Sequence, residues 1–145
     1  MKETKAERKV RQDYEETQLV NVLRSAGNLV QPEHPVCPDR KWRVDYLVTP
    51  NGMFCHDCGQ EPLIALEIQG IGFGHHSFGA IMKTYEKNNA IAARGWRLVQ
   101  VTRAQVANGE ALEALARCGV RVEAPCPHAS GQTAEGNCAR CGAGR

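Results

Sequence analysis

The sequence predicts a mixed α/β domain built around a small sheet, followed by a separate cysteine-rich tail. Over the first 123 residues, stretches of alternating apolar residues and stretches with an apolar stripe occur in the order helix, strand, strand, helix, strand, helix. After Pro125 no apolar periodicity remains, while cysteines become frequent. We therefore expect one domain over residues 1–123, with a cysteine-containing insert at 50–62, and a small independent unit over 124–145.

The first predicted element is a helix over residues 1–27. Charged residues crowd its start, and Gly27 is expected to stop it. Its apolar stripe consists of Leu19, Val20, Val22 and Leu23. Residues 28–41 contain three prolines, so we expect an extended loop there, with room for one edge strand over 30–36.

Two strands are predicted next, at residues 43–49 and 63–69, because apolar and other residues alternate in both. The polar insert between them makes a long antiparallel hairpin the simplest arrangement. A glycine-rich turn then leads into a helix over 76–94. The apolar stripe of that helix consists of Phe78, Ile81, Met82, Tyr85 and Ile91 or Ala92.

A third strand is expected over residues 96–102. Because a helix separates it from the strand at 63–69, the two strands should be parallel neighbours in one sheet. A last amphipathic helix is predicted over 104–117, followed by a short edge strand over 120–122.

Composition limits the class of protein. The chain has 145 residues and a formal net charge of +2, which excludes a uniformly basic nucleic-acid coat protein but permits a local basic surface. No apolar stretch approaches the ~18 residues of a membrane span, and the charged N-terminus differs from a signal peptide. We therefore expect a protein of the cytoplasm that does not bind membranes. Seven cysteines without a secretion signal indicate metal binding or reduced thiols rather than disulfides.

Two acidic residues interrupt the apolar pattern of the hairpin strands. Asp45 and Glu67 occupy strand positions where an ionised carboxylate is costly unless it is paired or binds a metal. If the strands pair, both carboxylates converge at one end of the sheet beside the peptide carbonyl of Ile68. Such hard oxygen ligands suit Mg²⁺ or Mn²⁺. The alternative is that both acids form surface salt bridges with Arg43 or Arg97.

Several short segments in order resemble the PD-(D/E)XK nuclease superfamily, in particular small phage and bacterial endonucleases of the very-short-patch-repair and VRR-NUC groups. The resemblance covers residues 16–103. The segments that carry it are Arg40-Lys41-Trp42-Arg43-Val44-Asp45-Tyr46, Leu66-Glu67-Ile68-Gln69-Gly70, Gly74-His75-His76-Ser77-Phe78-Gly79, Tyr85-Glu86-Lys87-Asn88-Asn89 and Gly95-Trp96-Arg97.

This resemblance implies a restriction-endonuclease-like αβββαβ core and a DNA endonuclease of a bacterium or phage-infected cell. It implies that Asp45 and Glu67 bind Mg²⁺, that a water on the metal attacks the phosphorus, and that Glu16 assists metal binding. The substrate is then a branched, mismatched or nicked DNA, or a plain duplex. The sequence leaves the oligomeric state open, a homodimer included.

The chain departs from the superfamily pattern two residues after the glutamate. Relatives usually carry lysine there, whereas this chain has Gln69, which can orient water but has no charge to offset a developing anion. Lys87 is expected to supply the cation; Lys83 is the other option, although a solvated helix face explains it as well. His76, after the glycine-rich loop, is a candidate for phosphate contact or proton transfer, or is a surface residue.

Basic residues flank the acidic pair on both sides and are expected to contact DNA phosphates without reading the base sequence. They are Arg40, Lys41, Arg43, Lys83, Lys87, Arg94, Arg97 and Arg103.

The tail carries the pattern Cys-x-His followed by Cys-x-x-Cys. Four such ligands in a segment too short to form a core predict one structural Zn²⁺. The ligands are Cys126, His128, Cys138 and Cys141. The tail resembles the zinc-ribbon-like tails of many phage nucleases, which implies a role in stability or in an extra contact.

The insert contains a second cysteine pair, Cys55 and Cys58. The pair either forms a second zinc site with neighbours such as Cys37 and His34 or His56, or joins the tail cysteines, or is a decayed site. Cys118 is expected to be an ordinary buried thiol.

Two functions of different class fit these sequence features. The first is a metal-dependent DNA endonuclease, which the pair of carboxylates favours. The second is a zinc-stabilised, non-catalytic DNA-binding protein with a decayed nuclease site, which Gln69 keeps open. A zinc deaminase or redox protein would need an open catalytic zinc motif that the sequence lacks.

Overall fold

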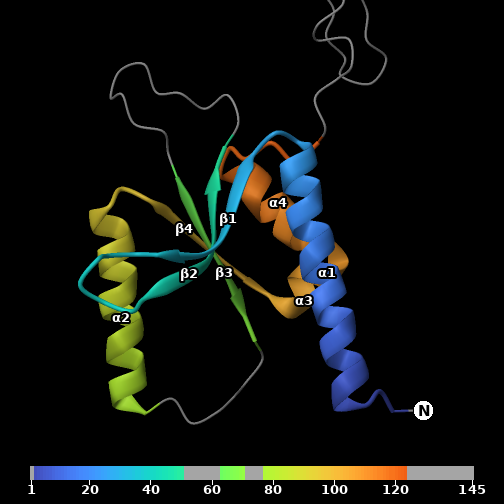
Figure 1. Ribbon diagram of the computed structural model, residues 1–145, viewed down its shortest axis with the longest axis horizontal. Helices are drawn as coiled ribbons and strands as arrows, with labels where there is room; N and C mark the ends of the chain where they lie inside the picture. Colours follow the sequence, from blue (N-terminus) through green and yellow to red (C-terminus); the bar gives the residue numbers. More distant parts are fainter. Residues whose placement is uncertain (1, 51–62, 71–76, 124–145) are drawn as a thin grey trace, which may run out of the picture.

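The computed structural model describes residues 2–50, 63–70 and 77–123. They form a mixed α/β structure with one four-stranded mixed sheet in the order β1-β2-β3-β4 (Figure 1). The elements are α1 (Lys5–Ser25), β1 (Leu29–Pro35), β2 (Arg43–Thr49), β3 (Ile64–Gln69), α2 (Phe78–Ala93), β4 (Arg97–Thr102), α3 (Arg103–Asn108) and α4 (Glu110–Arg117). The insert and the tail, with all their cysteines, lie outside the described residues.

The strand pairing agrees with the predicted hairpin and βαβ unit. Strands β1 and β2, and β2 and β3, are antiparallel, whereas β3 and β4 are parallel. The proline-rich segment before β2 forms the edge strand β1, where proline is tolerated because one side of an edge strand lacks a partner.

The prediction of a short strand over 120–122 is wrong. The chain leaves α4 in a tight turn, and the amide of Val120 donates to the carbonyl oxygen of Leu115 at 3.1 Å, so this segment closes a helix end. Val120 itself is buried in the core.

Helix α1 covers one face of the sheet. Its start is fixed by a capping box, in which the Thr4 hydroxyl accepts from the amide of Glu7 and the Glu7 carboxylate accepts from the amide of Thr4. After its end, the buried Asn28 donates to the carbonyls of Leu23 and Arg121 at 2.8 and 2.7 Å. The end of α1 is therefore tied to the segment after α4.

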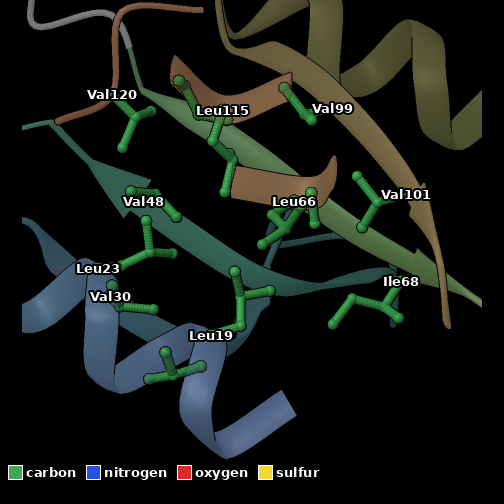
Figure 2. Close-up of a cluster of buried hydrophobic side chains, with 13 residues drawn as sticks. Leu19, Leu23, Val30, Val48, Leu66, Ile68, Val99, Val101, Leu115 and Val120 are labelled. Carbon is green, nitrogen blue, oxygen red and sulfur yellow. The ribbon is translucent and has the colours of Figure 1, made fainter. Parts of the chain in front are cut away.

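The larger core lies between the sheet and the helices α1 and α4 (Figure 2). Leu23, Leu66 and Leu115 are fully buried there, from α1, β3 and α4 respectively. A smaller core lies on the opposite face, where α2 packs. Its buried members are Val36, Val44, Leu47, Ala65 and Ile91. Trp42 and Trp96 lie against it, so the closed end of the β1–β2 hairpin reaches the end of α2.

Two predicted helices differ from expectation. The helix predicted over 104–117 is interrupted at Gly109, whose φ of +87° is the left-handed conformation that ends α3 and begins α4. In α2 most of the predicted apolar stripe is not buried: Phe78, Met82 and Tyr85 are exposed, whereas Ile91 is the buried residue of the helix. Only the C-terminal part of α2 contributes to the smaller core, so the N-terminal part of the stripe is largely exposed among the described residues.

Candidate functional site

The candidate site lies where β2 separates from β3. Strands β2 and β3 pair as far as Tyr46 and Leu66, and the next residues along each strand are Asp45 and Glu67. Beyond the last pair, a carboxylate oxygen of Asp45 accepts the amide N–H of Ile68 at 2.7 Å. The Asp45 side chain therefore accepts a hydrogen bond from β3 just past the last backbone pair, and this contact fixes the carboxylate beside β3.

Glu67 is held by a lysine from the helix that crosses this face. The Lys87 ammonium lies 2.5 Å from a carboxylate oxygen of Glu67. The two side chains are only 21% and 13% exposed, so the pair is largely shielded from water. Of the two lysines that the sequence offered as a cation for this site, Lys87 contacts Glu67, whereas Lys83 is exposed.

The pKa of Glu67 is raised above its ordinary value. Burial is the largest cause, and the charges of Asp45 and Glu33 act in the same direction, while the hydrogen bond and charge of Lys87 oppose them. The raised pKa means that Lys87 does not fully offset the cost of holding this carboxylate ionised. A further positive charge here would lower the Glu67 pKa.

Glu33 is an acidic residue that the sequence reasoning missed. It lies in β1 between Pro32 and His34, whose partners in β2 are Tyr46 and Val44, and therefore opposite Asp45. Its φ of +49° is unusual for a residue with a side chain, and its carbonyl oxygen accepts from the Arg43 guanidinium at 2.7 Å. Glu33, Asp45 and Glu67 thus form a row across three strands. The sequence allowed an edge strand over 30–36, but only its register with β2 places Glu33 beside Asp45.

A second polar cluster lies on the α1 side of the sheet. Glu16 of α1 accepts from the Tyr46 hydroxyl at 2.6 Å and forms an ion pair with Arg103 at 2.5 Å. Burial and the hydrogen bond to Glu16 raise the Tyr46 pKa, so the phenol stays protonated. Glu16, which the resemblance suggested as a metal ligand, has Tyr46 and Arg103 as its partners, and within the described residues it forms no hydrogen bond or ion pair with Asp45 or Glu67.

The remaining predicted residues have the following positions. Gln69 is exposed at the end of β3 and pairs with Thr102 of β4, directly before Arg103. The alternative salt bridges of Asp45 and Glu67 with Arg43 or Arg97 do not form, since those guanidinium groups donate to the carbonyls of Glu33 and Cys118. Cys118 is partly buried against the larger core, and Cys37 is also a free, partly buried thiol.

His76 and the predicted zinc ligands lie outside the described residues. These ligands are Cys55, Cys58, Cys126, His128, Cys138 and Cys141.

Two carboxylates at the hairpin could hold a divalent metal ion. Asp45 and Glu67 follow the last pair of β2 and β3, and the charge of Asp45 is one of the causes that raise the Glu67 pKa. Mg²⁺ is commonly held by one or two carboxylates and keeps several waters. Within residues 2–50, 63–70 and 77–123, no three His, Cys, Asp or Glu side chains are placed to hold one ion.

Comparison of the chain with known protein families, with curated proteins and with solved structures finds no match. Among the helices described, none has the length and apolar character needed to cross a membrane.

Proposed function

We propose that the protein is a divalent-metal-dependent DNA endonuclease with a restriction-endonuclease-like αβββαβ core. The supporting observation is the juxtaposition of two carboxylates and a lysine at one point of the fold. Asp45 is anchored beside β3 by the Ile68 amide, and Lys87 contacts Glu67, the residue directly before Ile68 in β3. Carboxylates to hold a metal and a cation to meet a phosphate are the parts that phosphodiester hydrolysis requires.

Asp45 and Glu67 would hold the Mg²⁺ or Mn²⁺ ion, with Ile68 contributing its backbone. When bound there, such an ion would polarise a phosphoryl oxygen and lower the pKa of a coordinated water. Lys87 keeps the Glu67 carboxylate in place through its ion pair and brings a positive charge to the site. Gln69, exposed at the end of β3, can accept a hydrogen bond from water and so orient it.

Lys87 compensates for the absent lysine at position 69. A glutamine cannot offset the negative charge that develops on the phosphate, whereas an ammonium can. Glu16, in contrast, serves as the partner of Arg103 in this proposal, not as a metal ligand. His76 and the structural zinc sites, at Cys126, His128, Cys138 and Cys141 and at Cys55 and Cys58, stay predictions from the sequence.

The test is cleavage of linear and branched DNA by purified protein with Mg²⁺, with Mn²⁺ and with EDTA. We expect metal-dependent cleavage that falls at least 100-fold in Asp45→Asn and in Glu67→Gln. Glu113→Gln, which changes an exposed carboxylate on α4, is the matched control and should retain full activity. Circular dichroism establishes that each variant is folded.

Two results would overturn the proposal. Cleavage that survives in both Asp45→Asn and Glu67→Gln would place the activity elsewhere or in a contaminant. Tight DNA binding without cleavage of any substrate would favour the alternative, a zinc-stabilised, non-catalytic DNA-binding protein, and would agree with the uncharged Gln69.

A further inference from the structure

We propose that two arginine–tryptophan pairs, Arg40 with Trp42 and Arg94 with Trp96, form a surface that binds the DNA backbone beside the cleavage site. This inference rests on the proposed function for the identity of its partner, but its test is independent of catalysis.

Each arginine lies over the ring of a tryptophan two residues later. The guanidinium carbon is 5.2 Å from the ring centroid in both pairs. Within the described part of the chain, neither Arg40 nor Arg94 forms an ion pair with a carboxylate, and both side chains are exposed. Stacking on a ring holds a guanidinium in place and leaves its N–H groups free for an anion.

The two tryptophans rest on the same small core. Trp42 and Trp96 both pack against the cluster that contains Val36 and Ile91. The amide of Val36 donates to the carbonyl of Trp42 at 2.9 Å, which closes the β1–β2 hairpin, and the ring of His34 meets that of Trp96 edge-on at 5.7 Å. The arginines therefore stand on rigid supports, so binding through them orders few additional side chains.

Basic side chains outnumber acidic ones on this surface, although the whole chain is nearly neutral at +2. Lys41 and Arg43 are exposed beside Arg40, and Arg43 donates to a neutral backbone carbonyl, that of Glu33. Together with Arg94 they make four basic residues, against the carboxylates of Asp39 in the turn and Glu33 in β1. Arginine recognises phosphate with paired, parallel N–H groups, which makes a nucleic-acid backbone the partner that fits best.

The surface adjoins the candidate active site along two elements. Arg94 follows Lys87 by seven residues, which is two helical turns on the same side of α2 and about 10 Å along its axis. Arg40 precedes Asp45 by five residues on the same hairpin. At roughly 3.4 Å per base pair, the distance of about 10 Å between Lys87 and Arg94 corresponds to about three base pairs of duplex. The arginines would therefore bind the DNA backbone just beyond the phosphodiester bond to be cleaved.

The test is the affinity of the full chain for a 20-base-pair duplex, measured by fluorescence anisotropy in EDTA, so that no cleavage occurs. We expect Arg40→Gln/Arg94→Gln to bind at least tenfold more weakly and to lower the slope of log affinity against log salt by about two. The control, Arg117→Gln/Arg121→Gln, removes two exposed charges elsewhere and should change the affinity less than twofold. Arg40→Lys/Arg94→Lys retains charge without the planar group and should fall between wild type and the glutamine variant.

Unchanged affinity and salt slope in Arg40→Gln/Arg94→Gln would overturn this inference, even if the carboxylate variants abolish cleavage. A loss of equal size in the Arg117→Gln/Arg121→Gln control would also overturn it, because binding would then follow total charge. Displacement of the duplex by poly-glutamate as effectively as by unlabelled DNA would assign the surface to acidic polypeptides instead. If Arg40→Gln/Arg94→Gln weakens DNA binding but the wild-type protein cleaves no DNA, the binding surface is supported and the proposed nuclease activity is refuted.

Discussion

Replacement of Lys87 by methionine tests the ion pair at the centre of the candidate site. The substitution Lys87→Met removes the ammonium that lies 2.5 Å from Glu67 and retains a long side chain that can pack against the sheet. In the variant, the Glu67 carboxylate stays half-buried next to the charges of Asp45 and Glu33 without its cation. We expect the folded state to lose stability.

The magnitude follows from the exposure of the pair. A solvent-exposed ion pair contributes about 0–1 kcal/mol, whereas breaking a fully buried pair costs about 3–5 kcal/mol. With side chains 21% and 13% exposed, Lys87 and Glu67 lie between these limits. We expect Lys87→Met to lower the free energy of unfolding by about 2 kcal/mol at pH 7.5, in line with the ~1.5–3 kcal/mol of a hydrogen bond to a charged group.

The loss should shrink at low pH. Because the pKa of Glu67 is raised in the folded state, its carboxyl group takes up a proton as the pH falls toward 4.5, and a neutral carboxyl group has little need of a cation. Urea denaturation followed by circular dichroism at pH 7.5 and pH 4.5 measures both values. Lys83→Met is the matched control, since Lys83 is exposed on the same helix, and it should cost less than about 0.5 kcal/mol.

Two outcomes would refute this reasoning. An equal loss at both pH values would mean that Lys87 stabilises through packing and not through the charge of Glu67. A loss no larger than that of Lys83→Met would mean that the pair behaves like an ordinary surface salt bridge.

Three further predictions concern other parts of the chain. Glu67→Gln should become more stable relative to wild type as the pH rises from 4 to 7.5, because it removes a carboxylate whose pKa is raised in the folded state. Urea denaturation across this range measures the difference in the free energy of unfolding between variant and wild type. A difference that moves in favour of wild type as the pH rises would contradict the prediction. Gly109→Ala should lower the melting temperature at a cost of about 1–2 kcal/mol because φ is +87°, whereas Gly79→Ala, within α2 and with open space around it, should raise stability by up to about 1 kcal/mol. Metal analysis should find about one zinc per chain from the tail, lost in Cys138→Ser, or about two if the insert also binds; no zinc would exclude both sites.

Local signals predicted most of the element order. Apolar alternation identified the strands over 43–49 and 63–69, the strand over 96–102 was also predicted, and Gly27 correctly marked the end of α1. These signals work because side-chain direction repeats every two residues in a strand and every 3.6 in a helix, whatever the element later contacts. Burial of Leu23 and Leu66 follows from the same periods.

Signals that depend on distant partners were weaker. The prolines indicated a loop with room for an edge strand over 30–36, and only the pairing with β2 shows that this strand forms and that Glu33 lies opposite Asp45. Gly109 divided one apolar pattern into two helices through its backbone angle, which periodicity does not reveal. The N-terminal part of the α2 stripe, with Phe78 and Tyr85, stayed exposed because no other described element covers it.

The candidate site shows the same division. By itself, the sequence determined that two carboxylates interrupt adjacent apolar strands, that an uncharged glutamine stands at position 69, and that the tail carries three cysteines and a histidine at close spacing. Only the tertiary structure decided which partners these groups have. Asp45 accepts a hydrogen bond from the Ile68 amide, Glu67 forms an ion pair with Lys87, and Glu16 pairs with Arg103, 87 residues away. The physical reason is that the type of a residue sets the chemistry it can perform, whereas the energy of a buried charge depends on its neighbours, and packing of α1, α2 and the hairpin selects them.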